Sequence, residues 1–443
     1  MKNLKRPGAL LLSFLATTVA FRGSTQDWPQ WRGANRDARA TQFTAPKTWP
    51  KELKQQWKVT VGDGVATPSL VGDKLYVFSR QEGNEITRCL DAATGKEVWQ
   101  EKYESLGATG PASGFSGPRS SPTVAGGKVV TLGVRGMLSC LDAATGKKVW
   151  RKNDYPDAYP RFHPSSSPLV VDGWCIAQLG GPNEGVVAAY DLASGDEKWK
   201  WSGDSPAYAS PALMSVGGTK LIVAETERRI VAIDAADGKL VWETPFAVRG
   251  MGAYNAATPI VDGQTIIYTG SGRGAKAVKI EKGGDGFTAK ELWSNAEKSV
   301  QFNTPVLKEG LLYGLTAGNE FFCINTKDGQ TAWSAPASPA SGDSPAGPGG
   351  PGGPGGPGGP GGRGRGGRGG GGRGGYGSIV DAGSVLMALT PSSELVVFQA
   401  SDKAYTELAR IRVADTQTHA YPVISGNRIF IKDQDSVTLW TIE

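Results

Sequence analysis

The sequence predicts an all-β protein: an eight-bladed β-propeller of four-stranded antiparallel blades, in which an N-terminal strand completes the last blade and closes the ring. Three features of the 443 residues predict it. One phrase ending in tryptophan recurs along the chain, a second phrase containing proline recurs between its copies, and one strand near the N-terminus is left without a blade of its own. Self-similarity at such a period indicates a repeat architecture.

The first phrase places glycine four residues after Asp or Asn, and tryptophan four residues after the glycine. Asp or Asn caps a tight turn, glycine supplies the positive φ, and tryptophan lies on the strand that follows, so each copy predicts a β-hairpin. A sixth copy, at 281–293, has a longer turn. The five regular copies are 91–99, 142–150, 191–199, 234–242 and 325–333.

The second phrase is a small residue and proline, followed by apolar residues and a glycine turn. It occurs at 67–68, 121–122, 167–168, 210–211, 258–259 and 304–305, and the prolines are 54, 46, 43, 48 and 46 residues apart. These intervals suit a four-stranded blade. Residues 421–426 continue the series, and 378–383 fill the remaining gap with Ile379 in place of proline. The chain therefore contains eight blade starts.

Each unit divides into four short β-rich runs separated by turns, which predicts an antiparallel meander. In the unit 122–150 these runs are 123–125, 128–134, 137–142 and 147–150. The last unit, 422–443, has room for three strands only. We expect the strand around Trp57 to supply the fourth, which would leave the ring without an exposed edge.

The N-terminus is typical of an export signal. Lys2, Lys5 and Arg6 precede an apolar run and a small-residue cleavage site after Ala20. We expect residues 1–20 to be a cleaved signal peptide, with an uncleaved anchor as the alternative, and 21–54 to be a Trp-rich arm. The mature protein is then a periplasmic or secreted monomer without a transmembrane span.

Residues 346–377 contain 21 Gly, 5 Pro and 4 Arg, and separate the expected closing strand and blades 1–6 (55–345) from blades 7–8 (378–443). Such a composition cannot bury a core, so we expect a disordered insertion. A flexible spacer, an RNA-binding Arg-Gly-Gly segment and a collagen-like helix are the alternatives. Without these four arginines and the three signal-peptide cations, the net charge of +6 becomes −1. No nucleic-acid partner is expected.

The Asp-x-x-Thr-Gly-Lys-x-x-Trp phrase resembles the pyrroloquinoline-quinone (PQQ) repeat of eight-bladed quinoprotein dehydrogenases and of the outer-membrane assembly factor BamB. The resemblance covers residues 50–335 well and 378–443 loosely. It implies that the repeat tryptophans dock between neighbouring blades. These are Trp57, Trp99, Trp150, Trp199, Trp242, Trp293 and Trp333.

The segment 27–37 also resembles the start of many mature quinoprotein-like propellers. Its tryptophans and arginines are consistent with a packed strap across one end of the propeller, and a binding role is the alternative.

A quinoprotein dehydrogenase needs an aromatic floor, cations for the quinone carboxylates, a Ca²⁺ held by oxygen ligands and a catalytic Asp. The alcohol-oxidising members of that family also share a pair of adjacent cysteines, and this chain has no such pair. Cys89, Cys140 and Cys323 occupy one repeat position, and Cys175 is the fourth cysteine. We interpret them as small buried hydrophobes, although their disulfide pairing stays open. No catalytic residue, metal site or cofactor is predicted. PQQ and Ca²⁺ would be bound only in the alternative, in which the protein is a PQQ-dependent oxidoreductase.

Candidate ligand residues come from the connections that enter each blade, because these loops line one mouth of a propeller channel. Their mixture of cation, imidazole, aromatics and amides would suit an anionic or polar ligand. The candidates are Arg119, His163, Tyr208, Tyr254, Asn255, Gln301, Phe302, Tyr376 and His419.

These observations predict an exported, non-catalytic binding or assembly scaffold with protein partners in the cell envelope, of which a BamB-like role in outer-membrane protein assembly is one version. The alternative is a PQQ-dependent oxidoreductase acting on an alcohol or polymer. A sugar-binding module is a third interpretation.

Overall fold

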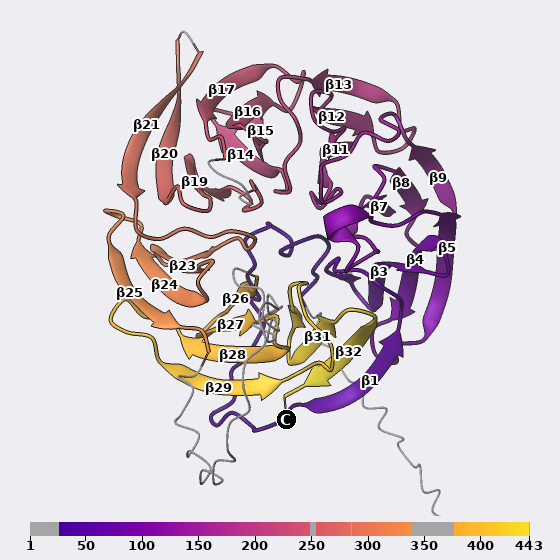
Figure 1. Ribbon diagram of the computed structural model, residues 1–443, viewed down its shortest axis with the longest axis vertical. Coiled ribbons are helices and arrows are strands. Elements are labelled where there is room, and N and C mark those ends of the chain that lie inside the picture. Colours follow the sequence, from indigo (N-terminus) through magenta and orange to yellow (C-terminus); the bar gives the residue numbers. More distant parts are fainter. Residues whose placement is uncertain (1–25, 249–253, 285, 339–375, 443) are drawn as a thin grey trace, which may run out of the picture.

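The computed structural model describes residues 26–248, 254–284, 286–338 and 376–442. Their strands form eight four-stranded antiparallel sheets arranged as the blades of a ring (Figure 1). The one helix in these ranges is a short 3₁₀ turn, η1 (Gly110–Ala112). The predicted all-β, eight-bladed propeller is therefore confirmed.

The first four blades follow one another along the chain, each as a meander of four strands. Blade 1 contains β2 (Ser69–Val71), β3 (Lys74–Gln81), β4 (Asn84–Asp91) and β5 (Glu97–Glu104). Blade 2 contains β6 (Thr123–Ala125), β7 (Lys128–Leu132), β8 (Leu138–Asp142) and β9 (Lys148–Lys152). Blade 3 contains β10 (Leu169–Val171), β11 (Trp174–Leu179), β12 (Val186–Asp191) and β13 (Glu197–Trp201). Blade 4 contains β14 (Ala212–Val216), β15 (Thr219–Glu225), β16 (Arg229–Asp234) and β17 (Leu240–Pro245).

The other four blades complete the ring. Blade 5 contains β18 (Ile260–Asp262), β19 (Thr265–Thr269), β20 (Ala275–Gly283) and β21 (Gly286–Asn295). Blade 6 contains β22 (Val306–Lys308), β23 (Leu311–Leu315), β24 (Glu320–Asn325) and β25 (Thr331–Pro336). Blade 7 contains β26 (Ser378–Ala382), β27 (Val385–Leu389), β28 (Glu394–Gln399) and β29 (Glu407–Arg412). Blade 8 contains β30 (Val423–Ser425), β31 (Arg428–Lys432), β32 (Ser436–Thr441) and the N-terminal β1 (Lys54–Thr60).

The closure of the ring is the pairing of β1 with β32, as the sequence predicts. Gln55 lies opposite Trp440 and Val59 opposite Val437 in an antiparallel register. The buried Lys432 strengthens the same junction, because its Nζ lies within hydrogen-bond distance of four carbonyl oxygens, including that of Gly64 at 2.9 Å. The first and last parts of the chain are thus joined both by the sheet and by a side chain.

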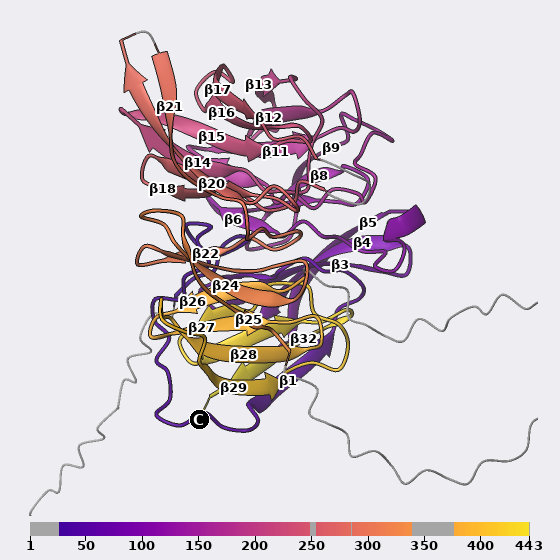
Figure 2. The same cartoon turned by 60° about the vertical axis from the view of Figure 1, so that its left-hand side comes forward.

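The repeat phrase forms the hairpin between the third and fourth strands of a blade. In blade 1 the Asp91 carboxylate accepts hydrogen bonds from the backbone N–H groups of Ala93 and Thr94, and Gly95 has a φ of 72°. In blade 5 the corresponding hairpin, β20–β21, is longer and projects beyond the rest of the ring (Figure 2). This is where the sequence shows its extended sixth copy.

Each repeat tryptophan lies against the next blade. The indole N–H of Trp99 donates to the carbonyl of Ala143 at 3.1 Å, and its ring lies where a Cβ on Gly146 would be. Trp57, Trp150 and Trp199 make the same pair of contacts with the turn of the following blade, and the ring of Trp293 lies against Gly329. Trp333 donates to the carbonyl of Ser401, and Trp242 packs into the cluster shared by blades 4 and 5.

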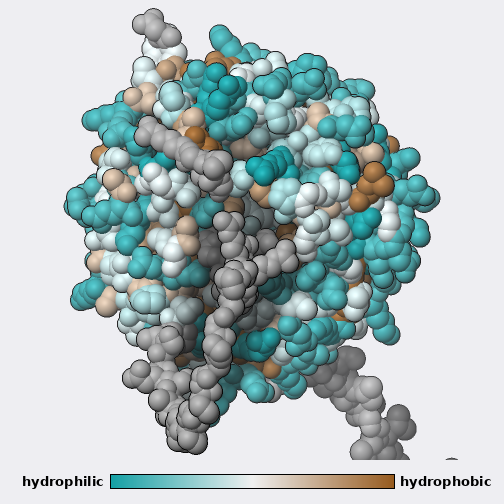
Figure 3. Space-filling model, in the orientation of Figure 1, coloured by the Kyte–Doolittle hydropathy of each residue, from teal (hydrophilic) through white to brown (hydrophobic). Residues whose placement is uncertain are grey.

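The apolar core consists of layers between adjacent blades, since clusters of buried residues link each blade to the next. On the face drawn in Figure 3 the surface is mostly hydrophilic, with apolar residues scattered singly. No helix of the described ranges is long and apolar enough to cross a membrane. The predicted signal peptide lies outside the described residues, as does the insertion up to residue 375.

Candidate functional site

The small residue before each proline supplies a hydroxyl to the inner wall of the ring. The backbone N–H of Ser121 donates to Oγ of Ser167 at 2.9 Å, and that of Ser167 donates to Oγ of Ser210 at 2.9 Å. The same bond joins Thr67 to Ser121, Ser210 to Thr258, Thr258 to Thr304 and Tyr421 to Thr67. We call these residues the hydroxyl ring. The sequence shows the Ser/Thr-Pro pairs, and the structure explains why that position carries a hydroxyl.

The N-terminal arm crosses the centre of the propeller, where it is the indigo segment in Figure 1. Its Trp28 is fully buried and pairs with Leu70 of β2. Arg32 donates to the carbonyl oxygens of Thr304 and Pro305, while Arg36 donates to those of Ser167, Pro168 and Pro211. Both arginines are at most 8% exposed. The arm therefore closes one end of the channel by binding the blade-entry carbonyls.

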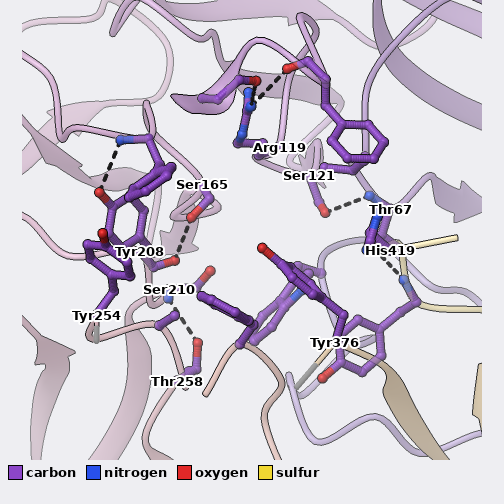
Figure 4. Close-up of a pocket in the computed structure, with 18 of the residues that line it drawn as sticks. Thr67, Arg119, Ser121, Ser165, Tyr208, Ser210, Tyr254, Thr258, Tyr376 and His419 are labelled. Atoms are coloured by element: carbon purple, nitrogen blue, oxygen red, sulfur yellow. Dashed lines mark hydrogen bonds between the residues drawn. The ribbon is translucent and has the colours of Figure 1, made fainter. Parts of the chain in front are cut away.

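A cavity of about 240 Å³ lies between this arm and the loops at the channel mouth (Figure 4). Trp31 of the arm and Tyr421 of blade 8 contribute to its lining, together with aromatic, hydroxyl and small side chains from most of the blades. The other lining residues are Val65, Thr67, Pro111, Ala112, Gly114, Phe115, Arg119, Ser121, Phe162, Ser165, Tyr208, Ser210, Tyr254, Ala256, Thr258, Phe302, Tyr376 and His419.

The aromatic side chains form two walls. On one side the ring centroids of Phe162 and Tyr254 are 4.7 Å apart with the rings 75° to each other, and Tyr208 meets Tyr254 edge-on. On the other side Phe302 and Tyr376 stack at 4.3 Å.

His419 extends this second wall, because its ring contacts Tyr376 edge-on and also contacts Phe115 edge-on. Figure 4 shows the labelled Tyr208 and Tyr254 across the cavity from Tyr376 and His419. Edge-to-face contacts of this kind stabilise each wall beyond the area it buries.

Six of the nine candidate ligand residues meet at this cavity: Arg119, Tyr208, Tyr254, Phe302, Tyr376 and His419. Tyr376 lies within the expected insertion 346–377, and in the structure it stacks on Phe302 and lines the cavity.

The other three candidates, His163, Asn255 and Gln301, do not line the cavity. His163 is buried and stacked on Tyr159, with Nδ1 2.8 Å from the carbonyl of Val134 and Nε2 accepting from the N–H of Thr109. Burial is the main cause that lowers its pKa.

Asn255 is 2% exposed, and its Nδ2 donates to the carbonyls of Thr226 and Phe246. The side chains of His163 and Asn255 therefore both hold loops together. The position of a residue next to a small-Pro pair does not show which way its side chain turns. Loop position also does not identify Trp31, Phe115, Phe162, Tyr421 or the hydroxyl ring, although the Ser/Thr-Pro pairs are a sequence signal for the hydroxyl ring.

Positive charge lies on two sides of the cavity. The Arg119 guanidinium donates to the carbonyls of Gly117, Ala112 and Phe115, and no carboxylate of the described residues forms an ion pair with it. Burial lowers its pKa. The Arg32 guanidinium lies 5.6 Å and 5.4 Å from the ring centroids of Trp31 and Tyr421. A guanidinium remains charged over the physiological pH range.

The lining fits a quinone with calcium poorly. Calcium prefers several oxygen ligands including carboxylates, and the described residues that line the cavity include no Asp or Glu. Among the same described ranges no group of three His, Cys, Asp or Glu side chains is placed to hold a metal ion.

The cysteines do not provide redox chemistry at this site. All four are buried as free thiols in blades 1, 2, 3 and 6. Burial is the main cause that raises the pKa of Cys89 to about 11 and of Cys140 and Cys323 to about 12. Thiols of such pKa are poor nucleophiles at neutral pH. Their environment is that of small buried hydrophobes.

Comparison with known proteins gives relatives of two kinds. The chain is 23% identical over 300 residues to the outer membrane protein assembly factor BamB of Yersinia pestis, covering 63% of this chain and 69% of that protein. It is 29% identical over 186 residues to a quinohemoprotein alcohol dehydrogenase of Comamonas testosteroni, covering 40% of this chain and only 26% of that protein. The match thus spans about a quarter of the dehydrogenase.

The fold is shared with solved structures. The crystal structure of the Comamonas testosteroni quinohemoprotein alcohol dehydrogenase superposes with a TM-score of 0.66 at 15% identity, covering 94% of this chain and 80% of that chain. A family model described as "Outer membrane protein assembly factor BamB" matches residues 47–200 and 82–335. Because these matches span well over half of the sequence, the chain belongs to the PQQ-repeat propeller family that carries this description.

Proposed function

We propose that this protein is an exported, non-catalytic binding or assembly scaffold of the cell envelope, and that the cavity at the channel mouth is its ligand site. The observation that carries the proposal is the lining itself: aromatic walls, hydroxyls and one arginine, held by loops from rigid blades. Such a lining supplies shape, apolar area and hydrogen bonds, which are the means by which proteins bind ligands.

The rigidity of the site supports the same interpretation. The hydroxyl ring ties seven of the eight blades together around the cavity, and the arm fixes the floor. A preorganised site of this kind spends little conformational entropy on binding. Propellers also present many loops on one face, where protein partners in the envelope would bind. The relative named as an outer membrane protein assembly factor supports this scaffold role and a periplasmic location.

The second candidate is a PQQ-dependent dehydrogenase, which the similarity to a quinohemoprotein alcohol dehydrogenase favours. The quinone would have to sit between the two aromatic walls with Arg119 facing a carboxylate. The described lining provides no carboxylate for the calcium and no Asp as base. We therefore place this function second.

One experiment separates the two functions. The purified full chain is incubated with PQQ and Ca²⁺, and reduction of a dye acceptor is followed with a series of alcohols. A scaffold gives no alcohol-dependent dye reduction. Turnover that requires both PQQ and an alcohol would overturn the proposal.

A genetic test addresses the scaffold role directly. In a strain that lacks the protein, we expect the outer-membrane protein content to fall and wild-type protein to restore it. Phe162→Ala, which removes part of one cavity wall, should restore it poorly, whereas Phe287→Ala on the projecting β20–β21 hairpin serves as control. If both variants restored the outer-membrane protein content equally, the cavity would not be needed for the scaffold role.

A further inference from the structure

The floor of the cavity offers hydrogen-bond donors. Thr67, Ser121, Ser210 and Thr258 belong to the hydroxyl ring and also line the cavity. In each of them the oxygen accepts the backbone N–H of the preceding blade, at 2.9–3.0 Å. A serine or threonine hydroxyl carries one hydrogen besides its lone pairs. The bond from the neighbouring blade uses one lone pair of each oxygen, so the O–H hydrogen is still available and each hydroxyl can donate toward the cavity.

Arg119 adds charge to these donors. Three of its N–H groups are used by the carbonyls of Gly117, Ala112 and Phe115, which hold the guanidinium beside the cavity. A guanidinium has five N–H donors, so two of them have no acceptor among the described residues. Behind the floor, Arg32 stacks on Trp31 and Tyr421 and places a second positive charge close to the cavity.

No carboxylate of the described residues lines the cavity. The charges of Asp63 and Glu85 act on Arg119 from outside the lining, and Oδ2 of Asp63 accepts hydrogen bonds from the N–H and the hydroxyl of Ser116. Donors and positive charge together are complementary to an oxyanion, and charge-assisted hydrogen bonds are about twice as strong as neutral ones.

The two aromatic walls determine which kind of molecular body can accompany this oxyanion. Tyr208 and Tyr254 face Tyr376 and His419 across the cavity (Figure 4). Phe162 packs edge-on against Tyr254, and Phe302 stacks on Tyr376. Aromatic walls on two sides favour a flat, apolar body that meets them by stacking or edge contacts. The volume of about 240 Å³ and the floor formed by Trp31 limit this body to a small molecule.

We infer that the cavity binds a small aromatic carboxylate, with the carboxylate at Arg119 and the hydroxyl ring and the aromatic body between the two walls. The inference rests on the proposed function, because it names the ligand class of that site. It requires no metal and no reaction.

The test uses 2-naphthoate and its neutral amide, 2-naphthamide, which have the same aromatic body. Each is titrated into the full chain by isothermal titration calorimetry. We expect the carboxylate to bind at least about tenfold more tightly than the amide, as charged hydrogen bonds predict. The difference should shrink as salt is added, since added ions screen the charge. Equal binding of the two probes, or binding of neither, would overturn the inference.

Variants locate the binding site. Arg119→Gln should remove most of the preference for the carboxylate, Arg119→Lys should keep part of it, and Arg412→Gln at an exposed position of β29 should leave it unchanged. Because Arg119 also holds a loop, Tyr254→Ala is a second variant. It should weaken the binding of both probes equally, because it removes part of an aromatic wall and no charge. If Arg119→Gln folds and binds naphthoate as the wild type does, the site is elsewhere and the inference fails.

This outcome is independent of the test of function. Failure of naphthoate to bind would leave the scaffold proposal standing, whereas alcohol-dependent dye reduction would overturn the scaffold proposal whatever naphthoate does.

Discussion

The guanidinium of Arg36 donates a hydrogen bond to the carbonyl of Pro211 at 2.8 Å, although the two residues are 175 positions apart. Arg36 also reaches the carbonyls of Ser167 and Pro168, so one side chain of the arm joins blades 3 and 4. Arg32 donates to the carbonyls of Thr304 and Pro305 at blade 6 and to the hydroxyl of Tyr421 at blade 8. The arm is therefore a central tie of the ring.

Replacing Arg36 by methionine should destabilise the protein. The three carbonyls lose a charged donor in a buried place, and each such bond contributes about 1.5–3 kcal/mol. We expect the free energy of unfolding to fall by about 3–5 kcal/mol, measured by urea unfolding. Arg412→Gln, on the outer strand β29, is the matched control and should change it by less than about 0.5 kcal/mol. An unfolding midpoint of Arg36→Met equal to that of the control would contradict the role of the tie.

The hydroxyl ring makes a second prediction. Ser167→Ala leaves the buried N–H of Ser121 without its acceptor, which should cost about 1–3 kcal/mol. Ser167→Thr keeps the hydroxyl and should cost much less, because Thr258 and Thr304 play the same part in blades 5 and 6. Urea unfolding of the two variants side by side tests this. If alanine were tolerated as well as threonine, packing alone would explain the small residue.

The contact between tryptophan and glycine can be tested with two glycines of equal φ. Gly146 has a φ of 72° and a Cβ there would lie 2.5 Å from the ring of Trp99, whereas Gly127 has a φ of 70° and open space. Both alanine variants carry the same backbone strain. Gly146→Ala should be less stable than Gly127→Ala by about 1–3 kcal/mol, the cost of overpacking. Thermal unfolding that gives equal losses would show that the indole moves aside freely.

Glu225 makes stability depend on pH. It is fully buried, and neither carboxylate oxygen accepts a hydrogen bond from the described residues. Burial raises its pKa well above 4.5, and the charge of Arg273 opposes this shift only in part. The folded state holds this proton more tightly than the unfolded chain, so its contribution to stability is complete below pH 4.5 and is lost as the pH rises through the folded pKa.

Glu225→Gln should therefore be more stable than the wild type at pH 8 and should flatten the decline of stability above pH 4.5. Chemical unfolding across the pH range measures this. Glu104→Gln, at an exposed position of β5, serves as control and should follow the wild-type profile. A Glu225→Gln variant that is destabilised at pH 8 would show that the carboxylate is needed in its ionised form.

Removal of residues 346–375 should leave the propeller folded, because a segment of that composition cannot contribute to a core. We expect a thermal unfolding temperature within about 2 °C of the wild type, corresponding to a negligible change in free energy. The deletion stops before Tyr376, which stacks on Phe302. Loss of cooperative unfolding in this variant would contradict the spacer interpretation.

The candidate site was predictable in part. Loop position brought Arg119, Tyr208 and Tyr254 to the same cavity, because equivalent connections in a ring must converge on its axis. It failed for His163 and Asn255, whose side chains turn toward neighbouring backbone instead. The floor residue Trp31 comes from the arm, and no periodic pattern connects the arm with the blades.

The number of blades, the strands within them and the closure of the ring can be read from the sequence alone, because these depend on local turn chemistry and on a period repeated along the chain. Which side chains face the cavity, and where the arm lies, became clear from the folded structure. The direction of a loop side chain, and the pairing of Arg36 with carbonyls more than a hundred residues away, depend on contacts that form after the blades are assembled.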